Sequence, residues 1–363
     1  MVFLMAPVWG IALAIVLYAA QQPHQDYFDA QVQLGGARAV LAGRSPYEDV
    51  YYSPYWTAVL LAPFALLPAS LAAATLFWAN LAGWFLTTIL TLRMLRWQWG
   101  LPLFTFAAAM VIFPPVIWTT HGQVVVYIAL GLTLFLVLVQ RHSGLAGASL
   151  ALLMAKPHLG AWLALLLLLW VVRRKSWSAL AGFGLAMAGL LAICFALQPG
   201  WVGDWLNALL HTAAALQEQR DRFGAIPVYF FRIFLNETLS QSLAILLAVV
   251  VGGASLWSLW KERPLPGIER VMTLGLVTLF FVTPYAQGYD LSLLYFPLAF
   301  FGTIRLQRRV VLRAWQIAAW GAAYLFPWVM PFLRWPQPVF VILPVLCLAL
   351  WLSHDWPQQT EER

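Results

Sequence analysis

Apolar runs long enough to cross a lipid bilayer recur along the chain, and they constrain its fold more than any other feature. A helix needs about 20 apolar residues to cross a hydrocarbon core roughly 30 Å thick. By that measure we predict about twelve spans, near residues 3–20, 69–92, 101–118, 122–140, 144–155, 157–172, 177–197, 239–260, 271–284, 290–304, 311–330 and 337–353. Only 10% of the side chains are charged, too few to cover a soluble globule. The sequence therefore predicts an all-α polytopic membrane protein, with residues 1–363 forming a single membrane domain.

The cysteines and the charge balance exclude several other classes of protein. Cys194 and Cys347 lie inside apolar runs, where a cysteine is usually a small buried hydrophobe. We therefore predict neither a disulfide framework nor a metal cluster. The formal net charge is +7, but the basic residues do not cluster with aromatic ones as in nucleic-acid-binding domains. We expect no nucleic-acid partner, and membrane topology explains the basic excess better.

Loop charges predict the topology. The apolar stretch at residues 53–68 has about 16 residues and an internal Pro63, so it is short for a crossing and interrupted for a straight helix. When it is not counted as a span, most of the 21 basic residues fall in cytoplasmic loops and most of the 14 acidic residues fall outside. We therefore predict a multi-pass protein of the plasma (inner) membrane with both termini cytoplasmic. Residues 53–68 are expected to lie on or dip into the outer leaflet.

Two sizeable external segments follow from this topology, residues 21–68 and 198–238. The first has the pattern of an amphipathic helix over residues 26–42, in which the apolar side chains gather toward one side. These side chains are Val32, Leu34, Ala37, Val40 and Leu41. A helix of this kind lies along the membrane surface with its polar side over the mouth of the bundle.

Polar residues collect at the predicted outer ends of the spans, and Lys156 is the most informative of them. The apolar segment before it has about 12 residues, which make about 18 Å of helix, so its ammonium is expected below the outer surface. A phosphate is one anionic partner for it; snorkelling to lipid headgroups or pairing with a structural carboxylate is the alternative. His121 and His158 share its predicted depth and side, although a lone interfacial histidine is usually structural.

Acidic residues of the first external segment are candidates for a general base. Asp26 and Asp29 are one helical turn apart, so both can point toward the same recess. The alternative is a charge at a helix N-terminus, which suits Asp26 better than Asp29. In the second external segment, Arg222 suits bidentate phosphate contacts, but loop charges are often merely solvated. Asn236 begins an "NET" sequence that matches a glycosylation sequon, a short and frequent motif of little weight.

The order of several short motifs resembles glycosyltransferase family 87 of the GT-C superfamily, which comprises polyprenyl-phosphate-dependent mannosyl- and arabinosyltransferase-like proteins. These motifs are Asp29 followed by "VLAGRSPY" (40–47), "YSPYWTAVLLAPFALLP" (52–68), "HGQ" (121–123), "LLMAKPH" (152–158) and "TPYAQGYD" (283–290). The match is strong in the first 160 residues and thin afterwards. Each motif is weak alone, but their order and spacing make chance similarity improbable.

The resemblance implies a GT-C-type bundle of about twelve transmembrane helices, with external juxtamembrane helices in the first loop. It implies an inverting transfer of a hexose or pentose from a polyprenyl-phosphate donor to a lipid, glycan or protein of the cell envelope. The donor is a substrate, and no cofactor or metal is expected. Asp29 is the implied base, with Asp26 as the alternative. The implied donor-phosphate residues are Lys156, His121, Gln123, His158 and Arg222, and the implied substrate pocket contains Tyr47, Tyr285, Gln287 and Asp290.

Two other functions stay open at this point. A transporter or flippase of lipid-linked sugars needs polar groups or broken helices near the membrane midplane, which the sequence supplies poorly apart from Pro114 and Pro115. A non-catalytic relative serving as a scaffold would tolerate the loss of Asp29. The sequence leaves the sugar and the acceptor undetermined, because "GQVVV" lacks the asparagine that often follows "GQ" in the family.

Overall fold

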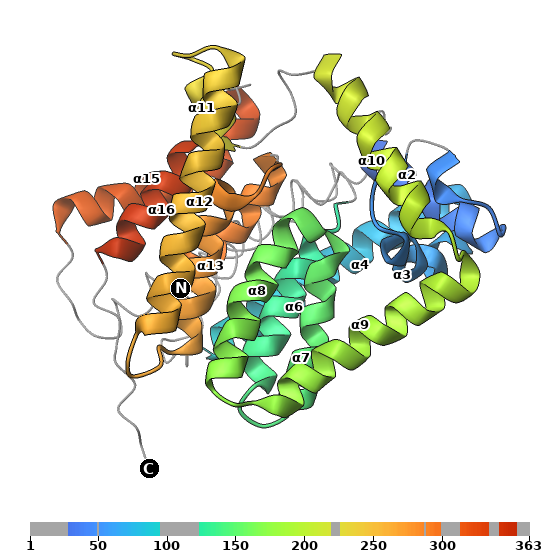
Figure 1. The fold of residues 1–363 in the computed structure, drawn as a ribbon, viewed down its shortest axis with the longest axis horizontal. Coiled ribbons are helices and arrows are strands. Elements are labelled where there is room, and N and C mark those ends of the chain that lie inside the picture. Colours follow the sequence, from blue (N-terminus) through green and yellow to red (C-terminus); the bar gives the residue numbers. More distant parts are fainter. Residues whose placement is uncertain are drawn as a thin grey trace, which may run out of the picture. The chain divides into compact units, whose positions relative to one another are not determined.

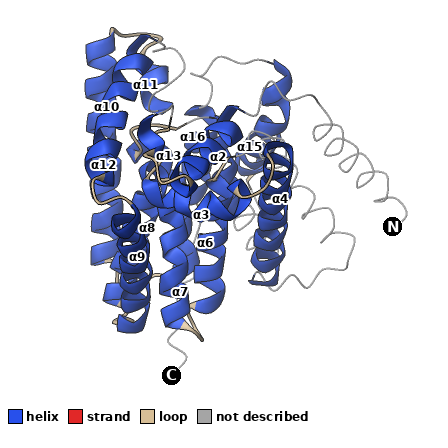
Figure 2. Cartoon of the chain, turned by 90° about the vertical axis from the view of Figure 1, so that its right-hand side faces the viewer, coloured by secondary structure: helices blue, strands red, loops and turns tan. Residues whose placement is uncertain are grey.

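The computed structural model describes residues 28–48, 51–94, 123–218, 226–286, 288–298, 313–333 and 341–353. Within these ranges every regular element is a helix and no strand occurs, as Figure 2 shows. The α-helices are α2 (Phe28–Leu41), α3 (Tyr55–Ala65), α4 (Ala69–Met94), α6 (Val125–Leu138), α7 (Ser143–Ser149), α8 (Pro157–Arg173), α9 (Trp177–Leu197), α10 (Trp201–Glu218), α11 (Ile226–Phe231), α12 (Glu237–Lys261), α13 (Ile268–Val282), α15 (Ala314–Leu333) and α16 (Ile342–Leu352). Three 3₁₀ helices are η1 (Pro46–Glu48), η2 (Leu150–Ala155) and η3 (Gly288–Leu294).

Three of the described helices are long and apolar enough to cross a membrane: Leu71–Thr91 within α4, α9 and α12. The most apolar windows of these helices are only 33%, 6% and 22% buried inside the protein. Contiguous apolar surface of this extent marks a contact with lipid or with a partner. The spans predicted at 69–92, 177–197 and 239–260 are thus confirmed as long apolar helices. The bundle of twelve stays a prediction, and the spans predicted at 3–20 and 101–118 lie outside the described residues.

The segment predicted as one span at 144–155 forms two different helices instead. Seven residues of α-helix, α7, are followed directly by the six-residue 3₁₀ helix η2. At the junction the Ser149 hydroxyl lies 2.7 Å from the carbonyl oxygen of Ala146 and 3.2 Å from that of Gly131, and serine bonds of this kind bend helices. Because a 3₁₀ helix rises about 2.0 Å per residue, α7 and η2 together span about 22 Å. Lys156 therefore still follows a segment shorter than the hydrocarbon core is thick.

The short helix α3 lies within residues 53–68, and the predicted location of this segment at the outer leaflet stays a prediction. It has 11 residues, contains Pro63 and begins after Pro54. The helix α6 begins at Val125 and has 14 residues, shorter than the predicted span at 122–140. Both helices bury most of their side chains, so they belong to the protein core more than to its apolar surface.

Contacts between residues divide the chain into two compact units. The first comprises Met1–Pro157 and Ala181–Glu218, and the second comprises His158–Leu180 and Gln219–Arg363. Figure 1 follows the chain through them from blue to red. Each unit is described by itself below, and the single membrane domain stays a prediction.

In the first unit, α2 packs on α3 and α4 packs on α6. The core between them is made of small and branched apolar side chains: Ala30, Leu34, Ala37, Leu61, Ala65, Ala72, Leu76 and Val124. The prediction that Leu41 lies on the apolar side of α2 is wrong, because Leu41 is 46% exposed. The polar Gln33, by contrast, is 7% exposed. The cause is tertiary packing, because α2 is covered by α3 and by the loop after η1 and not along one apolar stripe alone.

The two segments predicted to be external meet within this first unit. The ring of Trp56 in α3 contacts those of Trp201 and Trp205 in α10, at centroid distances of 5.4 and 5.9 Å. The Trp205 indole N–H donates a hydrogen bond to the carbonyl oxygen of Tyr52 at 3.1 Å. Near by, Ser45 Oγ donates to Asp204 Oδ2 at 3.2 Å. The helix α10 is thereby fixed on the loop that precedes α3.

In the second unit, α13 is the central helix and contacts α11, α12, α16 and η3. Its C-terminal half is tied to α8, because the Trp162 indole N–H donates to Thr278 Oγ1 at 3.1 Å. Trp170 of α8 donates to the carbonyl oxygen of Pro266 at 2.9 Å, just before α13 begins. These bonds fix the part of α8 that follows His158.

Gly36 in α2 supplies a first test of this packing. A Cβ at this position would lie 2.4 Å from Tyr51 Cδ2, so we expect Gly36→Ala to lower stability by about 1–3 kcal/mol through overpacking. Gly35→Ala is the matched control, because a Cβ there meets nothing within 4 Å and alanine is the better helix former. Thermal unfolding of the two purified variants measures the difference. Equal melting temperatures would contradict the described contact between α2 and Tyr51.

Candidate functional site

Three residues that are far apart in the sequence meet at helix ends in the first unit. Asp29 lies in the first turn of α2, Gln123 lies two residues before α6, and Lys156 is the residue between η2 and α8. Helix ends carry backbone groups without partners in their own helix, and an N-terminus favours negative charge. Pro157 begins α8, a position at which proline loses no hydrogen bond. The local structure therefore brings an acid, an amide and a cation to one place.

The side-chain amide of Gln123 connects the other two residues. Its Nε2 donates a hydrogen bond to Asp29 Oδ2, and its Oε1 accepts one from Lys156 Nζ at 3.4 Å. The second distance is at the long end of the range for a hydrogen bond. The Gln123 backbone is held as well, because Asn80 Nδ2 of α4 donates to its carbonyl oxygen at 3.3 Å. One oriented amide thus links a carboxylate to an ammonium.

Burial makes this arrangement costly. Lys156 is 9% exposed and Gln123 is 6% exposed, while Asp29 is half-buried. An ammonium withdrawn from water loses solvation free energy that only close polar partners restore. Replacing a buried polar network by apolar side chains often costs no stability, so a buried ammonium that is retained points to a role for the charge itself.

Two side chains of α3 fix the backbone directly before Lys156. The Trp56 indole N–H donates to the carbonyl oxygen of Met154 at 2.9 Å, and Thr57 Oγ1 donates to that of Ala155 at 3.1 Å. Carbonyl groups at the end of a helix have no partner inside it, so these bonds close the last turn of η2. The position of the Lys156 Cα therefore depends on α3, about 100 residues earlier in the chain.

Tyr47 lies in η1, near the loop that leads into α3. Its hydroxyl donates to the carbonyl oxygen of Ser53 at 3.2 Å, and its ring contacts that of Tyr51 at 5.7 Å between centroids. Burial raises the pKa of both phenols well above the ordinary value. Tyr47 and Tyr51 are therefore neutral hydroxyls at physiological pH and act as hydrogen-bonding groups.

Three other predicted site residues belong to the second unit. The ring of His158 lies 5.2 Å from that of Tyr285 in an edge-to-face contact. Thr283 Oγ1 joins them, at 2.7 Å from the carbonyl oxygen of His158 and 2.9 Å from that of Tyr285. Asp290 in η3 is fully buried. The second unit thus brings His158 and Tyr285 together, while Asp29, Gln123, Lys156 and Tyr47 belong to the first unit.

Four predicted site residues lie outside the described residues: Asp26, His121, Arg222 and Gln287. Among the residues that are described, no group of three or more histidine, cysteine, aspartate or glutamate side chains is placed to hold a metal ion.

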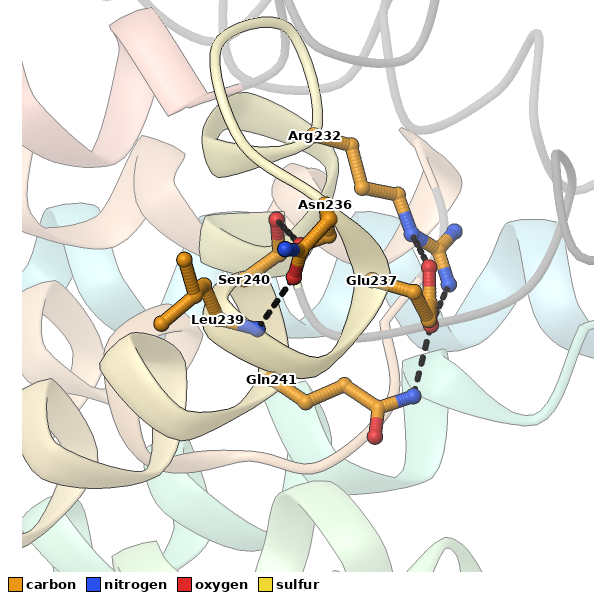
Figure 3. Close-up of polar contacts among 6 residues, drawn as sticks. All are labelled: Arg232, Asn236, Glu237, Leu239, Ser240 and Gln241. Atoms are coloured by element: carbon orange, nitrogen blue, oxygen red, sulfur yellow. Dashed lines mark hydrogen bonds and ion pairs between the residues drawn. The ribbon is translucent and has the colours of Figure 1, made fainter.

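Two further polar residues noted in the sequence have structural contacts at the start of α12, shown in Figure 3. Asn236 is the N-cap of α12, and its side-chain oxygen accepts a hydrogen bond from the backbone N–H of Leu239 at 3.0 Å. Arg232 binds Glu237 through two nitrogens, Nε at 2.6 Å and Nη2 at 2.5 Å. These contacts give both residues a structural role at the start of α12.

Sequence reasoning missed the residues that hold the site in place. Asn80 carried a usable signal, because it is the one amide in the apolar helix α4 and polar groups inside membrane spans are costly. Trp56 and Thr57 carried none, since an aromatic residue and a threonine in an apolar run are read as ordinary packing residues. Gln33 lies four residues after Asp29, and its sequence context gave no indication of a role either.

Long apolar helices, together with a half-buried acid and a buried amide and lysine at helix ends, define a membrane protein with a candidate acid–base and anion-binding site. The family model of glycosyltransferase family 87 matches residues 51–284, well over half of the chain. The chain belongs to glycosyltransferase family 87. Gln123 and Lys156 lie inside the matched range, and Asp29 precedes it. Comparisons with curated proteins and with solved structures gave no match.

Proposed function

We propose that this membrane glycosyltransferase transfers a hexose or pentose from a polyprenyl-phosphate donor to a lipid, glycan or protein acceptor, with inversion at the anomeric carbon. Membership of family 87 supports the transferase class. The observation that carries the finer proposal is the link from Asp29 through Gln123 to Lys156. It joins a candidate base to a candidate phosphate-binding cation through one amide.

The reaction needs these two groups on opposite sides of the transferred sugar. Asp29 takes the proton from the acceptor hydroxyl as its oxygen attacks the anomeric carbon. The bond between that carbon and the phosphate oxygen breaks, and the electron pair leaves with the polyprenyl phosphate. The ammonium of Lys156 stabilises the charge that develops on this phosphate. A single displacement of this kind inverts the configuration and uses no cofactor or metal.

Gln123 fits this chemistry as an orienting group. Its N–H donates a hydrogen bond to Asp29 Oδ2 and so orients the carboxylate. Its carbonyl oxygen holds the ammonium of Lys156 until a phosphate oxygen replaces it. We assign Gln123 to the donor site on this ground.

The remaining predicted residues stay proposals for the same reaction. His121, His158 and Arg222 are proposed for donor-phosphate binding, and Tyr47, Tyr285, Gln287 and Asp290 are proposed for substrate binding. Asp26 is the alternative base. The partners of the protein are then the lipid-linked donor, an acceptor of the cell envelope and the bilayer itself.

The test is sugar transfer by the purified protein from a panel of polyprenyl-phosphate sugars to a membrane lipid extract. Formation of a new glycosidic bond with at least one donor is the expected result. Donor movement between vesicle leaflets without such a bond would instead identify a flippase. Donor binding with neither transfer nor movement would identify a non-catalytic scaffold.

We also propose that the site faces outward from the plasma (inner) membrane, with both termini cytoplasmic. The two native cysteines are buried, so an introduced cysteine can be labelled selectively. We expect Glu48→Cys in intact cells to react with a membrane-impermeant maleimide, and Arg141→Cys to react only after the cells are opened. Both native side chains are exposed. The reverse labelling pattern would overturn the topology.

A further inference from the structure

Gln33 is a second polar side chain on the same side of α2 as Asp29. It follows Asp29 by four residues, so the two side chains are neighbours along the helix surface. Gln33 is 7% exposed, although α2 offers exposed positions such as Gln31 for a polar residue. An amide at a buried position next to the proposed base calls for an explanation.

One end of the Gln33 amide is anchored. Its Nε2 donates a hydrogen bond to Ser53 Oγ at 2.9 Å. Ser53 is held in turn, because its backbone oxygen accepts the Tyr47 hydroxyl at 3.2 Å. With the amide nitrogen on Ser53, the carbonyl oxygen of Gln33 points away from that hydroxyl.

The other end of this amide lacks a partner. Gln33 Oε1 is shielded from solvent and accepts no hydrogen bond from any of the described residues. Buried amide oxygens are nearly always paired, and an unpaired one lowers stability. A leucine would fill a similar volume without this cost. The retained oxygen is thus an acceptor, directed by Ser53, for a ligand that brings a hydrogen-bond donor.

We propose that Gln33 Oε1 accepts a hydrogen bond from a sugar hydroxyl when substrate lies against Asp29. This inference rests on the proposed function and names one contact of its site. A sugar fits because it carries several hydroxyl groups within about one helical turn, about 5.4 Å, of the reacting carbon. The sugar belongs either to the donor or to the acceptor, and separate kinetic measurements distinguish the two.

The test compares Gln33→Leu with Gln33→Glu in the full-length purified protein. Leucine removes the acceptor oxygen, whereas glutamate keeps acceptor oxygens and can itself accept a hydrogen bond from Ser53. We expect Gln33→Leu to raise the KM for one substrate by about tenfold, the effect of one lost hydrogen bond. Glutamate is expected to recover part of this loss. A raised KM for the donor assigns the hydroxyl to the donor sugar, and a raised KM for the acceptor assigns it there.

Gln316→Leu is the matched control. Gln316 is 4% exposed, and its Nε2 donates to Ser353 Oγ at 3.0 Å, so it makes the same kind of bond in the second unit. Its Oε1 already accepts the backbone N–H of Arg313 at 3.0 Å. We expect this variant to alter thermal stability without altering either KM.

Deoxy sugars give a readout that does not depend on how well a variant folds. A substrate lacking the recognised hydroxyl should react with native protein as poorly as the full substrate reacts with Gln33→Leu, and the two losses should not add. Unchanged KM values in both Gln33 variants, or independent losses with every deoxy sugar, would overturn the proposal and leave the oxygen a structural role. If the native protein itself transfers no sugar, the proposed function fails first.

Discussion

The variant Asp29→Asn is expected to transfer sugar about a hundred- to ten-thousandfold more slowly than the native protein, the usual range for loss of a general base. Asparagine cannot take up the proton of the acceptor hydroxyl. Its side-chain oxygen can still accept the hydrogen bond from Gln123 Nε2, so the arrangement around Lys156 should persist. We therefore expect the loss in kcat, with donor affinity largely retained. Single-turnover transfer and equilibrium donor binding measure the two quantities separately.

Glu48→Gln is the control for this variant. Glu48 lies in the same predicted external segment, and its ion pair with Arg44 at 3.9 Å is exposed to solvent, so it contributes little to stability. We expect full transfer activity. Equal rates in native protein and Asp29→Asn would move the base to Asp26 or elsewhere.

The long membrane helices could be predicted from the sequence with good accuracy. The prediction of 177–197 coincides with α9, and that of 239–260 differs from α12 by two residues at one end and one at the other. Lipid replaces tertiary packing as the surroundings of such a helix, so its length is set by the apolar run alone. Its neighbours in the fold do not need to be known.

Segments that bury their side chains against other helices were predicted less well. The change from α7 to η2 depends on the bond between Ser149 and Gly131, and the exposure of Leu41 depends on how α3 covers α2. Contacts between residues far apart in the chain are invisible to a pattern of apolar residues. Tertiary packing overrides local pattern at such positions.

The candidate site divides in the same way. Asp29 and Lys156 could be found because a carboxylate and a cation stand out in an apolar sequence. Gln123 could be found through the family motif, but its position between them could not. Gln33 is distinguished from a surface glutamine only by its burial and its bond to Ser53, and neither is visible in the sequence. Chemistry that depends on charge is visible in a sequence, whereas chemistry that depends on orientation needs the fold.

Lys156→Met is expected to slow transfer by about a hundred- to thousandfold, the effect of losing one group that stabilises charge in the transition state. Methionine keeps most of the length of the side chain and removes the ammonium. The charge on the departing polyprenyl phosphate then develops without its counterion. Donor affinity should fall as well, because the proposed contact between the ammonium and the donor phosphate is lost. Titration of the purified variant with donor, followed by single-turnover transfer, measures both effects.

Stability should change in the opposite direction, which separates a catalytic role from a structural one. Lys156 is 9% exposed, so its ammonium lacks most of the solvation it has in the unfolded chain. Its loss removes that desolvation cost, while Asp29 is half-buried and keeps the hydrogen bond from Gln123. We expect the melting temperature of Lys156→Met to equal or exceed that of the native protein. Lys261→Met is the control, since Lys261 is exposed and lies over the Trp257 ring at 4.2 Å, and it should transfer normally. A large fall in melting temperature for Lys156→Met, with unchanged transfer by the folded fraction, would make Lys156 a structural residue that the transfer reaction does not use.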